Sequence, residues 1–171
     1  LGRLVSQGGR IGAVGPGQPG PRAGATGASR VETAGAVEVR VGLTTAFDVP
    51  VEGASNVIGN RAYGNDPKTV TELGRAAAEG LMEGGMLPVM KHMPGHGRGF
   101  ADSHHNLPIV DVAREDLEAH DFAPFKALND LPIAMTGHLV FTAIDPDRPA
   151  TTSPIVIDEI IRGYIGFDGL L

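Results

Sequence analysis

Residues 86–97 read Met-Leu-Pro-Val-Met-Lys-His-Met-Pro-Gly-His-Gly, and this stretch decides the fold class. Its first part, residues 86–91, is a short apolar run that predicts a buried strand. Lys91 and His92 stand where that strand is expected to end, and the Pro and Gly residues after them predict a loop to about residue 106. Polar residues at the carboxyl end of a buried strand are typical of parallel α/β folds.

Upstream of this stretch, a strand pattern is followed by a helix pattern. Residues 43–49 predict a strand that ends at Asp48. Asp66-Pro67 predicts the N-cap and first turn of a helix, and Gly84-Gly85 predicts its end. The apolar residues at helical spacing between these signals are Val70, Leu73, Ala77 and Leu81.

Downstream, the same alternation continues. Residues 113–128 predict a helix interrupted near Pro124, and residues 133–136 predict a strand followed by His138. Ser153-Pro154 predicts the start of a helix that runs to residue 162, and residues 166–171 begin another strand. Strands and helices that alternate in this way predict an α/β fold with a parallel sheet.

Residues 1–42 differ in composition from the rest of the chain. They hold 11 Gly, 3 Pro and five Arg but no Lys, and they lack the period of an amphipathic helix or strand. We therefore expect an irregular or disordered segment at residues 1–42 and a folded domain at residues 43–171. A flexible tail and a reading-frame artefact in GC-rich DNA both remain open for the first part. The chain begins at Leu1 and stops within an apolar run, so we expect an internal fragment truncated at both ends.

The composition argues against several classes of protein. With 14 Lys+Arg against 20 Asp+Glu the net charge is −6, which gives no reason to expect a nucleic acid or an anionic membrane as partner. The absence of Cys excludes disulfides, a thiolate nucleophile and thiolate-bound metals. No apolar run approaches the length of about 20 residues that spans a bilayer, and the first residues lack the basic-then-apolar pattern of a signal peptide. We expect a cytoplasmic location.

Histidines concentrate in the loop after Lys91. Four of the six lie within residues 92–105: His92, His96, His104 and His105. One interpretation is a metal-dependent hydrolase built on His92, His96, Asp102 and His104, but the Pro and Gly residues between His92 and His96 forbid the helix that would align them. We expect no metal. Asp102-x-His104 suits a carboxylate–imidazole dyad that transfers protons, and a solvated surface loop is the third interpretation.

Six motifs follow one another along residues 47–171. They are Asn-Val-Ile-Gly-Asn-Arg-Ala-Tyr-Gly-Asn-Asp-Pro (56–67), Lys-His-Met-Pro-Gly-His-Gly (91–97), Asp-Ser-His (102–104), Ile-Asp-Pro (144–146), Pro-Ala-Thr-Thr-Ser-Pro (149–154) and Gly-Phe-Asp-Gly-Leu-Leu (166–171). In this order and spacing the chain resembles the bacterial β-N-acetylhexosaminidases of glycoside hydrolase family 3.

The resemblance implies a TIM-type (β/α)8 barrel, of which this chain carries a part truncated at both ends. It also implies a retaining glycosidase that works without a cofactor. Such an enzyme removes terminal non-reducing N-acetylglucosamine from peptidoglycan-derived muropeptides during cell-wall recycling in the cytoplasm. The expected partner is therefore a small carbohydrate.

Five residues take site roles through the resemblance. His104 corresponds to the general acid/base and Asp102 to its orienting partner. A histidine suits this role because its ordinary pKa of about 6.5 lets it donate a proton and then accept one. Arg61, Lys91 and His92 correspond to sugar-binding positions, where they would make charge-assisted hydrogen bonds to hydroxyl groups.

Other residues near strand ends receive a different interpretation. Asp48 is interpreted as structural rather than catalytic. His138 either lines the mouth of the barrel or is a core histidine with its hydrogen bonds satisfied. A salt bridge with Asp66 is the alternative to sugar binding for Arg61.

The nucleophile that the resemblance implies is an aspartate in a Ser-Asp-Asp run after Gly-Phe-Asp-Gly-Leu-Leu, and Asp168 is not that residue. We therefore expect the 171-residue chain to be inactive by itself. Two alternatives to the hydrolase remain open, an N-acetylglucosaminide phosphorylase of the same family and a non-catalytic sugar-binding remnant.

Overall fold

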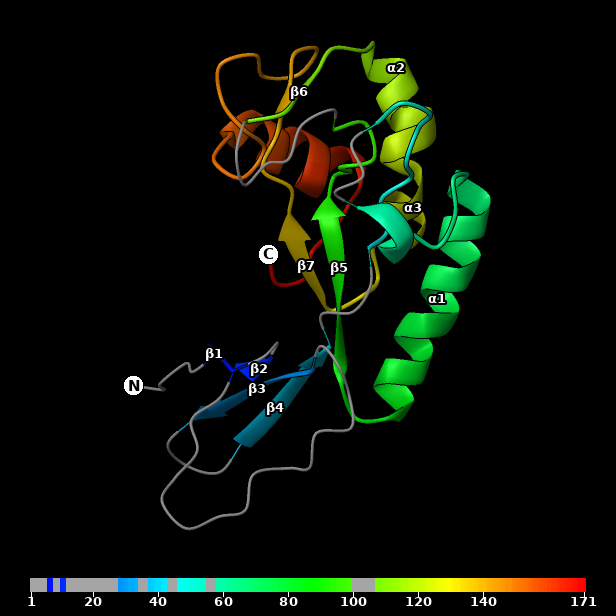
Figure 1. Cartoon of the computed structure of the whole chain (residues 1–171). Coiled ribbons are helices and arrows are strands. Elements are labelled where there is room, and N and C mark those ends of the chain that lie inside the picture. Colours follow the sequence, from blue (N-terminus) through cyan, green and yellow to red (C-terminus); the bar gives the residue numbers. More distant parts are fainter. Residues whose placement is uncertain are drawn as a thin grey trace.

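The computed structural model describes residues 46–54, 58–99 and 107–171, together with strand residues 6–7, 10–11, 28–33 and 37–42. The main sheet has the strand order β3 (Ala28–Thr33), β4 (Val37–Gly42), β5 (Leu87–Met93) and β7 (Ile133–Thr136). β3 is antiparallel to β4, whereas β4, β5 and β7 are parallel. Figure 1 shows β5 and β7 side by side, with α1 (Pro67–Glu83) alongside. The expected α/β fold with a parallel sheet is confirmed.

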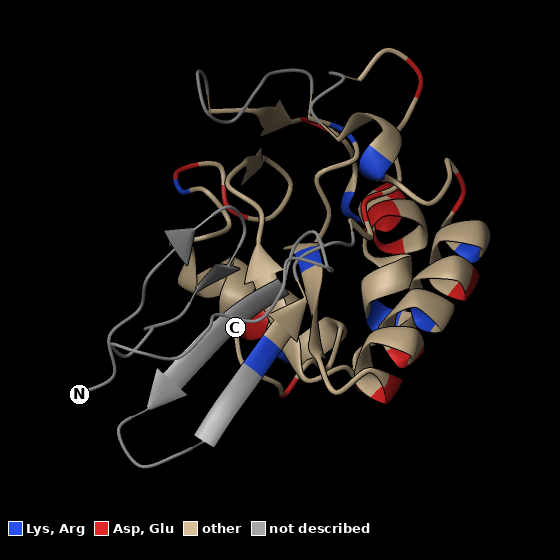
Figure 2. Ribbon diagram, turned by 60° about the horizontal axis from the view of Figure 1, so that its bottom comes forward, with Lys and Arg blue, Asp and Glu red and all other residues tan. Residues whose placement is uncertain are grey.

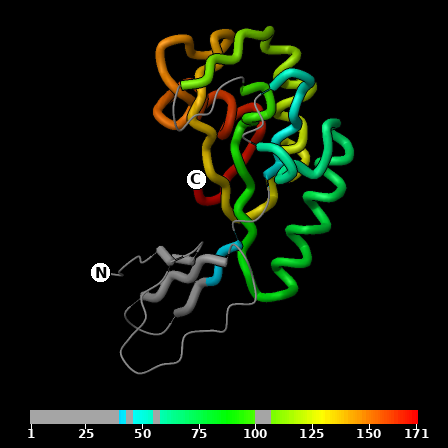
Figure 3. Tube along the Cα trace, viewed as in Figure 1, coloured from blue at the N-terminus to red at the C-terminus, as the bar shows by residue number. Residues whose placement is uncertain are grey.

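The remaining strands are short. β1 (Ser6–Gln7) pairs with β2 (Arg10–Ile11) in antiparallel register, and β6 (Ile109–Val110) pairs with β8 (Val140–Phe141) in parallel register. Leu170 bridges Ile133 in parallel, so the last residues continue the order of the sheet beyond β7. Figure 3 shows this C-terminal segment running beside β7.

The N-terminal region differs from the sequence expectation. Residues 28–33 and 37–42 form strands, where an irregular or disordered segment was expected. β4 joins the parallel sheet through the pairs Val41↔Leu87 and Gly42↔Pro88. The interpretation as irregular is therefore wrong for these two strands. Hydrogen bonds to a neighbouring strand stabilise them, and the composition of the segment does not report such pairing. Residues 12–27 lie outside the described residues, and the division at residue 42 stays a prediction.

The strand expected at residues 43–49 is reduced to one described position. Ala46 forms parallel bridges with Ala62 on one side and Lys91 on the other, and residues 43–45 lie outside the described residues. Residues 47–50 continue as an extended segment without ladder partners of their own. Phe47 and Val49 are nonetheless fully buried. Packing of these side chains and the backbone hydrogen bond from the Phe47 amide to the Lys91 carbonyl together fix the course of the chain around Asp48.

Helix α1 begins and ends where the sequence predicts. The Asp66 side chain accepts a hydrogen bond from the Thr69 amide at 2.9 Å, Pro67 follows it, and Gly84 ends the helix. Its buried face differs from the expectation: Val70, Gly74 and Ala78 are buried, whereas Leu73 is 47% exposed. This face needs a residue without a side chain at Gly74, because a Cβ there would lie 2.6 Å from Cδ1 of the buried Phe47 ring.

The helix expected at residues 113–128 forms as three pieces. They are α2 (Arg114–Asp116), the π-helical turn η2 (Leu117–Asp121) and α3 (Ala123–Ala127). The irregularity therefore precedes Pro124, which lies in the first turn of α3, a position that tolerates proline. The last helix begins at Pro154 and continues as η3 (Val156–Tyr164). Ser153 caps it as expected, with its hydroxyl accepting from the Val156 amide at 3.1 Å.

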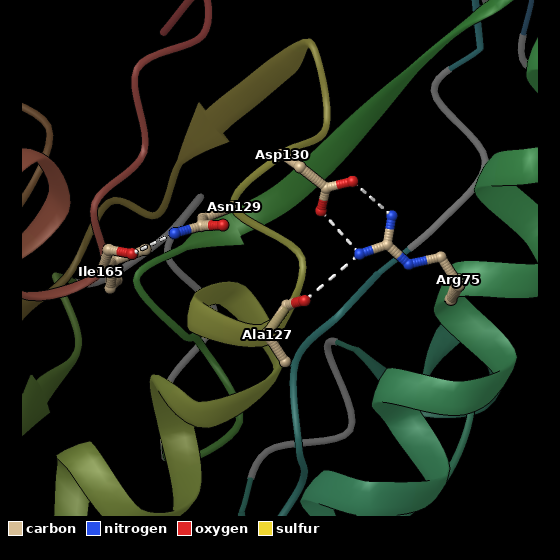
Figure 4. A network of polar contacts seen from close by, with 5 residues as sticks. All are labelled: Arg75, Ala127, Asn129, Asp130 and Ile165. Atoms are coloured by element: carbon tan, nitrogen blue, oxygen red, sulfur yellow. Dashed lines mark hydrogen bonds and ion pairs between the residues drawn. The ribbon is translucent and has the colours of Figure 1, made fainter.

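The core joins the helices to the sheet through aromatic side chains. Phe47, Phe122, Phe125, Phe141 and Phe167 are all buried, and the Phe122 and Phe141 rings meet edge to face at 5.7 Å. The outer surface of α1 carries charges of both signs, as Figure 2 shows. One of its cations, Arg75, forms a bidentate ion pair with Asp130 at 2.6 and 2.7 Å and also donates to the Ala127 carbonyl (Figure 4). This contact ties α1 to the end of α3.

Candidate functional site

The carboxyl end of β5 brings together residues that are far apart in the sequence. Ala46 lies between Ala62 and Lys91, with which it forms its two bridges, and the Phe47 amide donates to the Lys91 carbonyl at 2.6 Å. Arg61, which ends the short helix η1 (Gly59–Arg61), therefore lies near Lys91. The Arg61 side chain also donates from Nε to the Ile58 carbonyl at 3.3 Å. Two cations thus share one edge of the parallel sheet.

The carboxylate of Asp48 organises the residues that follow Lys91. Its side chain is fully buried. Oδ1 accepts hydrogen bonds from the backbone amides of His92 at 3.2 Å and His96 at 2.7 Å. Oδ2 lies 2.8 Å from Nδ1 of the His92 ring. One carboxylate therefore fixes both the backbone and the imidazole of the Lys-His-Met-Pro-Gly-His turn, which agrees with the structural interpretation of Asp48.

Burial shifts the pKa of two side chains in this cluster. It lowers the pKa of the Lys91 ammonium, and the positive charge of Arg61 lowers it further, while Asp48 opposes both effects. Burial also lowers the pKa of His96, again against the attraction of Asp48, with smaller contributions from His92 and Arg61. These couplings place Arg61, Lys91, His92, His96 and Asp48 in one electrostatic cluster.

The His96 ring is almost completely buried. It is 4% exposed, and neither ring nitrogen has a hydrogen-bond partner among the residues that the structure describes. A Cβ at Gly99 would lie 2.8 Å from Cε1 of this ring, so only glycine fits there. The His92 and His96 rings meet edge to face with centroids 5.8 Å apart. The second histidine of the motif therefore packs against the first rather than facing solvent.

A buried ion pair anchors the loop after the motif. Arg98 donates from Nε to Asp121 Oδ2 at 2.6 Å, and Asp121 is 1% exposed. Burial raises the pKa of Asp121, against the opposing hydrogen bond and charge of Arg98. Asp121 also packs against Gly95, where a Cβ would lie 3.0 Å from the Asp121 carbonyl oxygen. The loop is thereby held against η2.

The next parallel strand contributes a smaller polar group. His138 follows β7 and is exposed, with Nδ1 3.3 Å from the Thr151 hydroxyl. Thr151 donates to the Gly137 carbonyl at 3.0 Å. A Cβ at Gly137 would lie 3.4 Å from the His92 Cβ, so this group adjoins the cluster at β5. Of the two interpretations of His138, the core histidine is wrong, because the side chain is exposed at the sheet edge.

Three of the five predicted site residues meet in the structure. Arg61, Lys91 and His92 lie at the same edge of the sheet, as the contacts above show. Asp102 and His104 lie outside the described residues, so the dyad stays a prediction. The described part of the chain contains no group of three or more His, Asp or Glu side chains that could hold a metal ion. Two members of the metal interpretation, Asp102 and His104, lie outside that part, so this interpretation stays a prediction.

Sequence reasoning missed two features of this region. The first is that Asp48 binds His92 and His96; its place at a strand end was the only signal. The second is the Arg98–Asp121 pair, which no local sequence pattern indicates. Both join residues separated by 23 positions or more, and local patterns do not report such contacts.

Comparisons with known proteins identify the family to which this chain is related. The Glycosyl hydrolase family 3 N terminal domain matches residues 22–171. A "Beta-hexosaminidase" of Alkalilimnicola ehrlichii is 44% identical over 119 residues, which are 68% of this chain and 34% of that protein. A "Beta-hexosaminidase" of Methylococcus capsulatus is 41% identical over 159 residues, which are 87% of this chain and 47% of that protein.

A solved structure supports the same relationship. The crystal structure of NagZ from Neisseria gonorrhoeae is similar with a TM-score of 0.71 at 37% identity, covering 75% of this chain and 38% of that one. The same NagZ has been solved in complex with N-trifluoroacetyl-D-glucosamine. This chain spans about a third to a half of the length of the curated relatives described here. No helix among the described residues is long and apolar enough to cross a membrane.

Proposed function

Because this chain belongs to glycosyl hydrolase family 3 through its N-terminal domain, we propose that it is part of a retaining β-N-acetylhexosaminidase. Arg61, Lys91 and His92 bind the terminal N-acetylglucosamine. The observation that carries the proposal is their convergence at the carboxyl edge of the parallel sheet, where Asp48 holds His92 in place. The parallel order β4, β5, β7 and Leu170 is the part of a (β/α)8 barrel that this chain would contribute.

Each of the three sugar-binding residues offers a different kind of contact. Arg61 presents a planar guanidinium with several N–H donors, and Lys91 presents an ammonium group at the end of a buried strand. His92 adds an imidazole whose Nδ1 is already occupied by Asp48. Cationic donors bind hydroxyl groups through charge-assisted hydrogen bonds, which can strengthen as the sugar ring flattens toward an oxocarbenium-like transition state.

The chemistry that we propose proceeds in two displacements. A carboxylate from residues after Leu171 attacks the anomeric carbon, the glycosidic bond breaks, and His104 gives a proton to the leaving oxygen. Water then attacks the same carbon, the glycosyl–carboxylate bond breaks, and His104 takes the proton of that water while Asp102 stabilises the imidazolium. A muropeptide fragment in the cytoplasm is the proposed natural substrate, and no cofactor takes part.

Sugar binding and hydrolysis test the proposal separately. Calorimetry with N-acetylglucosamine on the 171-residue chain is expected to show binding, weakened by about tenfold in Lys91→Met, since one charge-assisted hydrogen bond is lost. Lys68→Met is the matched control, because Lys68 is exposed on α1 and makes only a 3.9 Å ion pair with Glu72. Equal affinity in wild type and Lys91→Met would contradict the assignment.

The activity test uses the longer polypeptide that the same reading frame encodes through to its stop codon. We expect it to hydrolyse 4-nitrophenyl N-acetyl-β-D-glucosaminide with retention of configuration, and the 171-residue chain to bind without turnover. His104→Ala should remove activity toward this substrate while sugar binding is retained. A sugar 1-phosphate product that forms only with added inorganic phosphate would indicate the phosphorylase instead. Sugar binding by both polypeptides, with no hydrolysis by the longer one, would indicate a sugar-binding remnant.

A further inference from the structure

The carboxylate of Asp48 accepts hydrogen bonds from residues of the candidate site itself, and because it is fully buried it does not face a bound sugar. Its side chain is fully buried, and its two oxygens face three nitrogen atoms: the His92 amide, the His96 amide and His92 Nδ1. A buried side chain with all of these partners inside the protein is not available to a sugar. Any effect of Asp48 on the reaction must therefore act through His92 and His96.

The three contacts decide which nitrogen of the His92 ring carries the proton. A carboxylate only accepts hydrogen bonds, so at the 2.8 Å contact between Oδ2 and Nδ1 the hydrogen belongs to Nδ1. A neutral imidazole has one N–H, which leaves Nε2 with a lone pair. Nε2 of neutral His92 then accepts a hydrogen bond rather than donating one.

We propose that Asp48 is a positioning residue that holds His92 in the Nδ1–H form and so presents Nε2 as the acceptor for a hydroxyl group of the bound sugar. This role rests on the proposed function, in which His92 binds the sugar. Lys91 and Arg61 supply donors to the same sugar, so an acceptor at His92 completes the recognition of a hydroxyl group that can donate and accept at once. The bond from Oδ1 to the His96 amide keeps the turn closed around this arrangement.

Asp48→Asn separates this role from a purely structural one. Asparagine has nearly the same shape but only one accepting oxygen, and its amide nitrogen only donates. The oxygen can keep the two backbone amides that Oδ1 holds now, which turns the amide nitrogen toward His92 Nδ1. Nδ1 must then accept, so the proton moves to Nε2. The variant is expected to keep its fold and to reverse the His92 tautomer.

The experiment is NMR of the 171-residue chain with 15N-labelled histidine at pH 8, where ordinary histidines are neutral. The two tautomers are distinguished by which ring nitrogen has the shift of an unprotonated nitrogen, and the His92 signals are assigned by their loss in His92→Gln. We expect the Nδ1–H form in wild type and the Nε2–H form in Asp48→Asn. Protonated Nε2 in wild type would overturn the proposal whether or not the variant folds.

Asp145→Asn is the matched control. Asp145 is also a buried aspartate that accepts a side-chain hydrogen bond, from Ser153 Oγ at 2.5 Å, but its partners Ser153 and Asp147 do not belong to the His92 turn. The Asp145→Asn variant should keep the His92 tautomer and the affinity for N-acetylglucosamine of the wild type. Asp48→Asn should instead weaken that affinity by about tenfold. A reversed tautomer with unchanged affinity would overturn the role. No binding by a wild type that shows the Nδ1–H form would instead refute the proposed function, because the contact between Asp48 and His92 would still stand.

Discussion

Gly97 is the position where the site depends most directly on the absence of a side chain. A Cβ there would overlap the carbonyl group of Val49 and lie 3.0 Å from the Pro50 nitrogen. These are backbone atoms, so no rotamer change relieves the overlap. The Gly97 carbonyl also accepts from the Val51 amide at 3.2 Å. Gly97→Ala must therefore push residues 49–51 away from the Lys-His-Met-Pro-Gly-His turn.

The expected loss of stability has two parts. Insertion of a methyl group into a packed site costs about 1 to 3 kcal/mol, and the weakened hydrogen bond adds about 1 kcal/mol. Gly97→Ala should thus lower the free energy of unfolding by about 2 to 4 kcal/mol. Because Asp48 precedes the displaced segment directly, the variant should also bind N-acetylglucosamine more weakly.

Urea denaturation followed by circular dichroism measures this change, with Gly80→Ala as the matched control. Gly80 lies in α1 and nothing comes within 4 Å of its added Cβ. The same substitution there should raise the free energy of unfolding by about 1 kcal/mol, because alanine favours a helix. A Gly97→Ala variant as stable as wild type, beside a stabilised Gly80→Ala, would show that Val49 and Gly97 do not meet as described.

Two further predictions concern ion pairs outside the electrostatic cluster around Asp48. Because burial raises the pKa of Asp121 above the ordinary value of 3.8, the folded state favours its protonated form, and the contribution of Asp121 to stability should fall as the pH rises through that raised value. Asp121→Asn should remove this part of the pH dependence, measured as urea midpoints across the acid range, and an identical profile in the variant would contradict the shift. Arg75→Ala should lower stability by no more than about 1 kcal/mol and less at high salt, since Asp130 is largely exposed. Lys68→Ala, which removes a weaker pair, should have a smaller effect, and a larger loss than for Arg75→Ala would refute the ranking.

The sequence predicted those parts of the fold whose causes are local. Asp66-Pro67 and Gly84 determine where α1 begins and ends, and both signals lie within a turn of the helix boundary. Ser153 likewise caps the last helix with its own hydroxyl. The buried face of α1 was predicted less well, because Leu73 suits a helix pattern but Phe47 admits only Gly74 at the contact. That preference comes from a residue 27 positions away.

The site shows the same division between local and distant causes. The resemblance selected Arg61, Lys91 and His92, and the structure brings them to one edge of the sheet. The reason that they meet is Ala46, which bridges both flanking segments and carries no chemical signal of its own. The strands at residues 28–33 and 37–42 were missed for a related reason, since their partner strands, not their composition, stabilise them.

The Lys-His-Met-Pro-Gly-His-Gly motif acquires its meaning only together with Asp48. Within the motif, Lys91 and His92 supply polar atoms, while Gly97 lets the loop touch the backbone after Asp48. Asp48 in turn holds the amides of both histidines, so each segment fixes the other. A chain that kept the motif but lost Asp48 would still carry the side chains proposed to bind the sugar, yet the ring of His92 would be free to rotate and exchange its proton between nitrogens. A site of this kind is therefore better identified by the motif together with Asp48, whose carboxylate binds His92, than by the motif alone.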